Sequence, residues 1–306
     1  MAKRKKTKAK NRRISFKLGK SRKTKQRAIP KPSLKGVFKV VLVICTLAAV
    51  GVLFYFAEQY VKSANLGKTG PLELVSVPGW VSDELKARIS AAAGGRTFRL
   101  DEEAARLVAE NLASTAWMAD VQVQTTHDRL LVKGRWRRPL ALIKRGLQSF
   151  YVDAELVVLD FVPVPNLSIV KVKGLSFIPR APQAGLLWQG DDLAAAVAIL
   201  ARLDRMDSLV TPDKPLLYEI DSIDVSNFNG RQDKRLAHII LYATDNTEII
   251  WGAQIGAWQR HLDASDEEKL AKLYGYYKEY GSLLNGVKYI NLRDPQLRIP
   301  QPIDKY

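Results

Sequence analysis

The sequence predicts an α+β protein with a single transmembrane helix, a module ordered strand, helix, helix, strand, strand, and a mostly antiparallel β-domain with two helices. Three observations lead to this prediction. One uninterrupted apolar run lies near the N-terminus, two amphipathic helical patterns and two alternating stretches follow it, and short strand patterns separated by Pro, Gly, Asn and Asp fill the remainder. The length of 306 residues suffices for two folded domains.

The net charge of +17 comes from one end of the chain. Residues 1–39 hold 17 Lys and Arg without Asp or Glu, whereas residues 40–306 hold 31 basic and 31 acidic residues. We expect a disordered cytoplasmic tail on the anionic leaflet, where each basic residue contributes about 1 kcal/mol. Binding of a polyanion or an acidic partner by the tail stays open. Nucleic acid is not the expected partner, because the body is neutral and the tail has only two aromatic residues, Phe16 and Phe38.

The apolar run at residues 40–57 reads VVLVICTLAAVGVLFYFA and contains no charged residue. A helix of this length covers about 27 Å, close to the hydrocarbon thickness of a bilayer. The alternatives are a buried core helix and a cleavable signal peptide. The run lacks a polar face, and its end at Phe54, Tyr55 and Phe56 does not resemble a small-residue cleavage site. The basic residues before the run predict a cytoplasmic N-terminus and an extracytoplasmic body.

Small and helix-breaking residues predict a linker at 58–70, followed by a module at 71–144. Ser82 and Asp101 are N-cap residues for two helices, each with helical spacing of apolar side chains. The expected strands are 72–77, 118–124 and 129–136. A three-stranded sheet covered by two helices would bury these apolar stripes.

A β-rich domain is expected at 145–294, before a C-terminal tail at 295–306. Helices are predicted at 192–206 and, behind a Ser-Asp-Glu-Glu start, at 265–280. The predicted strands are 149–152, 156–162, 168–172, 216–220, 223–226, 238–243, 248–251 and 289–292.

No catalytic, metal or cofactor-binding residues are predicted. His127, His238 and His261 lie far apart in the sequence and form no HxxxH or HExxH motif. The triplet at residues 68–70, KTG, lacks the Ser-x-x-Lys and Ser-Asp-Asn partners of penicillin-binding enzymes. The single cysteine, Cys45, excludes an intrachain disulfide. We therefore expect a binding protein that is not an enzyme and has no small-molecule substrate.

The order of parts resembles the bacterial cell division family FtsQ/DivIB, and local motifs support the resemblance. Residues 117–123 and 130–141 are similar to that family's tryptophan, paired strands and "ERxPxA"-like close of a POTRA module, although Arg137 replaces the usual acidic residue. Residues 150–159 resemble the following "YLVDxxGxVL" segment without its glycine turn. Residues 241–252 resemble an "LxxGxxVxLG" hairpin, and residues 289–293 resemble a terminal "YVDLR" strand with Asn291 in place of the aspartate.

The resemblance implies a septal inner-membrane scaffold that recruits FtsB- and FtsL-type division proteins. In the family a partner strand is added beside the last strand of the β-domain. On this chain the implied partner-binding residues are Tyr289, Ile290, Asn291, Leu292 and Arg293. An extension of this strand to Ile299 would be interrupted by Pro295. The alternative is an ordinary edge strand that binds no partner and whose proline prevents further strand pairing.

Two other function classes stay open. A POTRA-containing envelope transport or secretion component would act on polypeptides, although an outer-membrane barrel would need more ten-residue alternating segments than this chain has. A cell-wall enzyme is the third class, and the motif search gives it no support.

Overall fold

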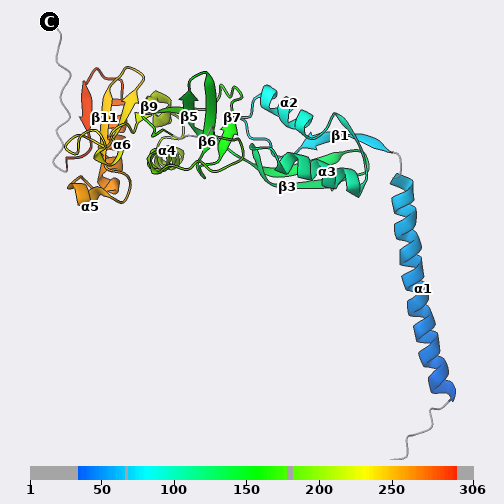
Figure 1. The fold of residues 1–306 in the computed structure, drawn as a ribbon. Coiled ribbons are helices and arrows are strands. Elements are labelled where there is room, and N and C mark those ends of the chain that lie inside the picture. Colours follow the sequence, from blue (N-terminus) through cyan, green and yellow to red (C-terminus); the bar gives the residue numbers. More distant parts are fainter. Residues whose placement is uncertain (1–33, 66–67, 178–181, 295–306) are drawn as a thin grey trace, which may run out of the picture. The chain divides into compact units, whose positions relative to one another are not determined.

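The computed structural model describes residues 34–65, 68–177 and 182–294, which form two compact units, 1–60 and 61–306 (Figure 1). Residues 1–33 of the predicted basic tail and the whole of the predicted C-terminal tail lie outside the described residues.

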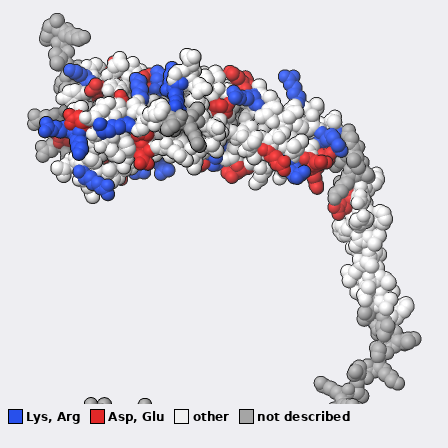
Figure 2. All heavy atoms as spheres, viewed as in Figure 1, with Lys and Arg blue, Asp and Glu red and all other residues white. Residues whose placement is uncertain are grey.

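Helix α1 spans Leu34–Asn65 and contains the predicted apolar run. Its residues 41–60 are long and apolar enough to cross a membrane, and no other described helix passes this test of length and composition. None of that stretch is buried against other parts of the chain, and its side chains are exposed apolar groups with few charges (Figure 2). This exposure contradicts the alternative of a core helix packed inside a soluble domain.

The linker predicted at 58–70 is shorter in the structure, because α1 continues to Asn65 and strand β1 already begins at Thr69. The next elements form the first sheet of the C-terminal unit. Their bounds are β1 Thr69–Leu74, α2 Asp83–Ala92, β2 Thr97–Arg99, α3 Glu102–Ala113, β3 Met118–Thr125 and β4 Leu130–Trp136.

The first sheet has four strands in the order β2-β1-β4-β3, with β1 parallel to β4 and the other pairs antiparallel. The two predicted N-caps are confirmed: Ser82 accepts the N–H of Leu85, and Asp101 accepts the N–H of Ala104. The predicted three-stranded sheet is wrong by one strand. The short β2 joins it through three backbone pairings with β1, which a side-chain pattern does not reveal.

An eight-stranded sheet follows, in the order β12-β11-β10-β9-β8-β5-β6-β7. The strands are β5 Pro139–Arg145, β6 Gln148–Asp153, β7 Val158–Asp160, β8 Val170–Lys173, β9 Ile220–Asp224, β10 Ile239–Ala243, β11 Glu248–Gly252 and β12 Tyr289–Asn291. The helices are α4 Asp191–Val210, α5 Trp258–His261 and α6 Asp266–Tyr280, with 3-10 turns at Leu216–Glu219 and Phe228–Gly230.

The α+β class is confirmed, but the expected mostly antiparallel sheet is mixed. Strands β5, β8 and β9 run parallel to one another, and β12 runs parallel to β11. The chain also enters this sheet earlier than the predicted boundary at residue 144, because β5 pairs with β6 and β8 rather than with the first sheet. Helix α5 adds a short third helix to the two expected ones.

One face of the eight-stranded sheet packs against α4 and α6 in a continuous apolar core. Buried side chains at helical spacing, such as Leu193, Leu200 and Leu273, meet the inward residues of the strands. The strand predicted at 216–220 is wrong over most of its length, because Leu216 and Leu217 donate their N–H groups to the buried carboxylate of Asp207. Those bonds hold the segment in a 3-10 turn.

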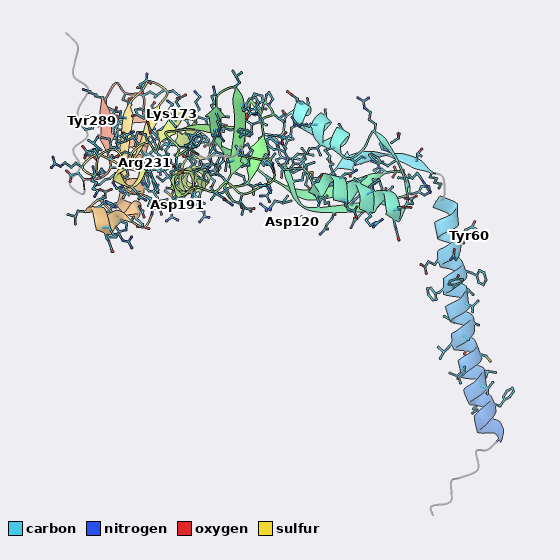
Figure 3. The ribbon with its side chains drawn as sticks, viewed as in Figure 1. Tyr60, Asp120, Lys173, Asp191, Arg231 and Tyr289 are labelled. Atoms are coloured by element: carbon cyan, nitrogen blue, oxygen red, sulfur yellow. The ribbon has the colours of Figure 1, made fainter. Side chains whose placement is uncertain are left out.

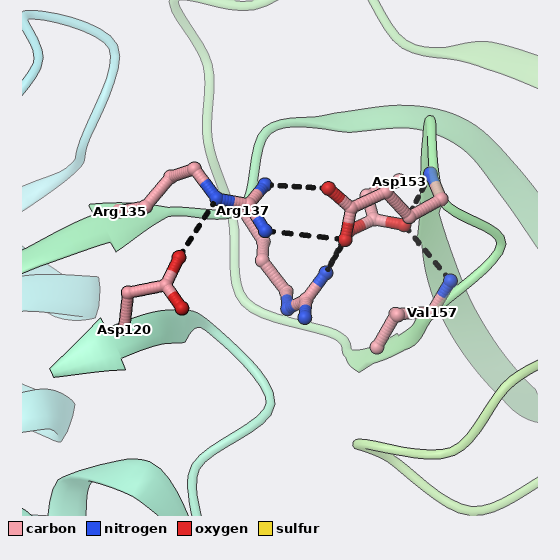
Figure 4. Close-up of polar contacts among 6 residues, drawn as sticks. Asp120, Arg135, Arg137, Asp153 and Val157 are labelled. Atoms are coloured by element: carbon pink, nitrogen blue, oxygen red, sulfur yellow. Dashed lines mark hydrogen bonds and ion pairs between the residues drawn. The ribbon is translucent and has the colours of Figure 1, made fainter.

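The two sheets are joined by a second core that both of them line. Trp117 packs edge-on to Tyr151 of β6, with ring centroids 6.2 Å apart, and its Nε1 donates to Asp160 at 3.0 Å. Beside this core, Arg137 pairs with Asp153 at 2.7 Å and with Glu155 at 2.8 Å (Figure 4). Arg137, which replaces the acidic residue of the FtsQ-like pattern, therefore links the end of the first sheet to the second sheet by ion pairs.

The turn between β6 and β7 forms although it has no glycine. The Asp153 carboxylate accepts the N–H groups of Glu155 and Val157, at 2.9 and 2.8 Å (Figure 4). Leu156 adopts the left-handed conformation, with φ of 63°, that glycine would adopt more easily. The Asp153 side chain thus compensates for the missing glycine.

Candidate interaction site at the edge of the eight-stranded sheet

Strand β12 is the terminal strand of the sheet, and it lies next to β11 alone among the described residues. Ile290 is fully buried in the core, which holds the strand against the sheet. The preceding turn is fixed by Thr247, whose Oγ1 donates to the carbonyl of Val287 at 3.0 Å. The structure thus places four of the five predicted residues in or directly after an edge strand of three residues, Tyr289–Asn291.

The hydrogen bonds to β11 determine which peptide groups of β12 face outward. Glu248 donates its N–H to the carbonyl of Lys288, and Leu292 donates its N–H to the carbonyl of Ile250. In a parallel ladder alternate residues bond to the same neighbour, so the peptide groups of Ile290 also point to β11. The N–H and C=O groups of Tyr289 and Asn291 consequently point to the open edge.

The side chains along this edge alternate between the core and the surface. Ile290 and Leu292 are fully buried, and Asn291 is half-buried. Tyr289, which is labelled in Figure 3, is 38% exposed. The Asn291 Oδ1 accepts the N–H of Arg293 at 3.0 Å, which turns the chain after the strand. The edge therefore offers two peptide groups and one exposed aromatic ring to an incoming strand.

Arg293 does not continue the strand and instead ties its end to the start of α6. Its Nε donates to Asp263 Oδ1 at 3.0 Å, and its carbonyl accepts the N–H of Ala264 at 2.7 Å. Of the five predicted site residues, Arg293 is thus an anchor rather than part of the pairing edge.

Asp263 is the centre of a buried charge cluster that sequence reasoning did not find. Its Oδ2 lies 3.3 Å from the Nζ of Lys269, which is fully buried and 5.5 Å from the Trp251 ring. Burial alone would raise the pKa of Asp263, but the N–H of Ala253 and the guanidinium of Arg293 outweigh it and lower the pKa. Burial lowers the pKa of Lys269, and the attraction of Asp263 opposes this effect.

Gly252 leaves room for this cluster at the end of β11. Its φ is +91°, and a Cβ there would lie 2.1 Å from Asp263 Oδ2 and 2.7 Å from Arg293 Cγ. No other residue type fits both the conformation and the space. This glycine closes the hairpin that resembles an FtsQ-like motif, and it was the one sequence signal of the cluster.

The geometry of the β12 edge suits recognition through main-chain hydrogen bonds. Among the described residues, no group of three or more His, Cys, Asp or Glu side chains is arranged to hold a metal ion. His238 and His261 contact each other, with ring centroids 4.5 Å apart, whereas His127 lies in the turn between β3 and β4. Scans against models of protein families and against curated proteins found no match to this chain.

Proposed function

We propose that this chain is a bitopic inner-membrane scaffold of the bacterial division machinery, of the FtsQ/DivIB type. It holds FtsB- and FtsL-type partners at the septum by strand addition to β12. The observation that carries the proposal is the outward peptide groups of Tyr289 and Asn291 on an open strand edge. The proposal assigns no catalytic step, and the apolar stretch of α1 supplies the membrane anchor.

The eight-stranded sheet has two edge strands, β12 and β7, and their surroundings favour β12 as the docking edge. At the β7 edge, Val158 donates its N–H to Leu186 and accepts the N–H of Gly185, so a segment of this chain already covers it. At the β12 edge, no described segment occupies the corresponding positions. Of these two edges, β12 is therefore the one whose outward N–H and C=O groups are available to an added strand.

A proline at position 291 tests the proposal, with Asn291→Ala as its matched control. Both substitutions remove the Asn291 side chain that accepts the N–H of Arg293, but only proline removes the outward backbone N–H. We expect Asn291→Pro to reduce co-purification of the FtsB- and FtsL-type partners from the same bacterium about tenfold, which corresponds to about 1.4 kcal/mol. Asn291→Ala should retain capture. Equal co-purification of the partners with both variants would show that partner binding does not use the outward N–H of β12.

One observation favours the alternative of a polypeptide-handling envelope component. Strand β3 is also an edge strand and, with eight residues, is longer than β12. A component of this class would be spread along the envelope, whereas a division scaffold would gather at the septum. A fluorescent fusion that stays uniform in dividing cells would favour the alternative.

A further inference from the structure

Two histidines from distant parts of the sequence meet in the C-terminal unit. His238 directly precedes β10, and His261 is the last residue of the short helix α5, which is labelled in Figure 1. Their rings are in edge-to-face contact, with centroids 4.5 Å apart and an interplanar angle of 79°. His238 is 8% exposed, whereas His261 is exposed. The pair is therefore a contact between the end of α5 and the start of β10.

Charged side chains from every neighbouring segment surround this pair. They are Lys234 before β10, Arg260 on α5, Asp263 before α6, Lys269 on α6 and Arg293 after β12. Arg293 opposes a proton on His238, and Asp263 favours one. Lys234 lies close to the same ring, because a Cβ at Gly230 would lie 3.1 Å from Lys234 Cγ and 3.4 Å from His238 Nε2. Asp263 is thus the one carboxylate in this set.

This carboxylate already has two cationic partners. Asp263 pairs with Arg293 at 3.0 Å and with Lys269 at 3.3 Å. Burial lowers the pKa of His238, and the proximity of His261 and Arg293 lowers it further. The attraction of Asp263 opposes this change in pKa. Because the pKa is lowered only in the folded protein, the folded state loses stability as the pH falls below about 6.5.

We propose that the His238–His261 pair is an acid-sensitive latch, which holds α5 against β10 when neutral and releases it when protonated. A proton on His238 places a further cation beside Asp263 and repels Arg293, the residue that ties the end of β12 to the start of α6. Histidine suits this role because its charge changes between about pH 5 and 8. The effect on partner binding rests on the proposed function of β12, whereas the latch itself does not.

The amide of Ala264 reports on this link, because its N–H donates to the carbonyl of Arg293 at 2.7 Å. Hydrogen exchange of the full chain in zwitterionic nanodiscs gives the protection factor of this amide, which corrects for the pH dependence of the intrinsic rate. In the parent we expect it to fall about tenfold from about pH 7.5 to about pH 5.5, the most that one neutral histidine produces over this range. His238→Phe should keep its protection. The matched control His127→Phe, in the turn between β3 and β4, should show the same fall as the parent.

A variant at the exposed histidine tests the latch without changing a buried side chain. His261→Lys places a permanent positive charge beside His238 and should lower the protection of Ala264 at neutral pH toward the parent's value in acid. His127→Lys adds the same charge at another exposed position and should leave the protection unchanged. The proposal would be overturned by equal protection of the parent at both pH values, by an equal fall in His238→Phe, or by full protection in His261→Lys.

Co-purification of the FtsB- and FtsL-type partners separates the latch from the proposed function. We expect the parent to capture less partner at about pH 5.5 than at about pH 7.5, and His238→Phe to capture the same amount at both. Equal capture by the parent at both pH values would overturn control of β12 by the latch. A complete lack of capture would contradict the proposed function instead, and the exchange of Ala264 would still decide whether the latch exists.

Discussion

Leu262 adopts a backbone conformation that is unfavourable for leucine. It ends α5 with φ of 56° and ψ of 29°, in the left-handed region, and its side chain is 90% exposed. The exposed side chain gains little from packing, while the left-handed backbone costs a leucine about 1 kcal/mol. The chain therefore carries local strain at this helix end.

Leu262→Gly should raise the free energy of unfolding by about 0.5 to 1 kcal/mol, because glycine adopts this conformation without strain. The matched control is Leu107→Gly, which places the same change at a leucine 57% exposed inside α3 and should lower stability by about 1 kcal/mol. Tryptophan fluorescence during urea unfolding gives both values. A loss of stability in Leu262→Gly would show that the leucine makes contacts that its exposure does not reveal.

Residues that interact with near neighbours were the most predictable from the sequence. Ser265 forms a capping box with Glu268, and Ser82 and Asp101 cap their helices, because each contact spans only three residues. The cluster of Asp263 with Arg293 joins positions 30 residues apart, and Gly252 is its one signal in the sequence. Arg137 shows the same limit, since its partners come from the next sheet.

At the scale of elements, the buried cluster fixes the end of β12 to the start of α6. Asp263 has two cationic neighbours, Arg293 and Lys269, as well as the N–H of Ala253. Lys269 has Asp263 as its one carboxylate within ion-pair distance among the described residues. Substitution of Asp263 and substitution of Lys269 should therefore lower the free energy of unfolding by different amounts.

Asp263→Asn should lower the free energy of unfolding by about 3 kcal/mol, because it leaves the fully buried Lys269 without a countercharge. Lys269→Met should cost less than about 1 kcal/mol, since Asp263 keeps Arg293 and the N–H of Ala253. Chemical unfolding of both variants measures the difference. Equal losses, or a larger loss for Lys269→Met, would contradict this order.

Elements defined by side-chain periodicity were predicted well, and those defined by tertiary contacts were not. Helices α4 and α6 and strands β10 and β11 lie close to their expected bounds. The expected strand at 216–220 became mainly a 3-10 turn because Asp207 accepts its first two N–H groups. The open edge at β12 was inferred from family resemblance, since no local pattern reveals which strand lies last in a sheet.

For the molecule as a whole, the proposed function requires the basic tail and the body to lie on opposite sides of a membrane. The single cysteine, Cys45, lies within the apolar stretch of α1, which gives a low background for thiol labelling. A bilayer around α1 would also cover its exposed apolar side chains.

Lys133→Cys and Lys10→Cys test this arrangement, because one places a thiol on an exposed site of β4 and the other within the basic tail. A membrane-impermeant maleimide should label Lys133→Cys in intact spheroplasts and Lys10→Cys only after lysis. The parent chain should stay unlabelled in both preparations. Labelling of Lys10→Cys in intact spheroplasts would show that the basic tail lies outside the cytoplasm and would contradict the proposed orientation.

Residue-resolved amide hydrogen exchange tests strand addition at β12 most directly. In the free protein, the amides of Tyr289 and Asn291 point to the open edge, whereas that of Ile290 is bonded to β11. We predict fast exchange at the two outward amides and slow exchange at Ile290. Addition of the FtsB- and FtsL-type partners should slow the two outward amides at least tenfold, which corresponds to about 1.4 kcal/mol of protection. Unchanged exchange at these amides while the partners are bound would contradict strand addition at β12.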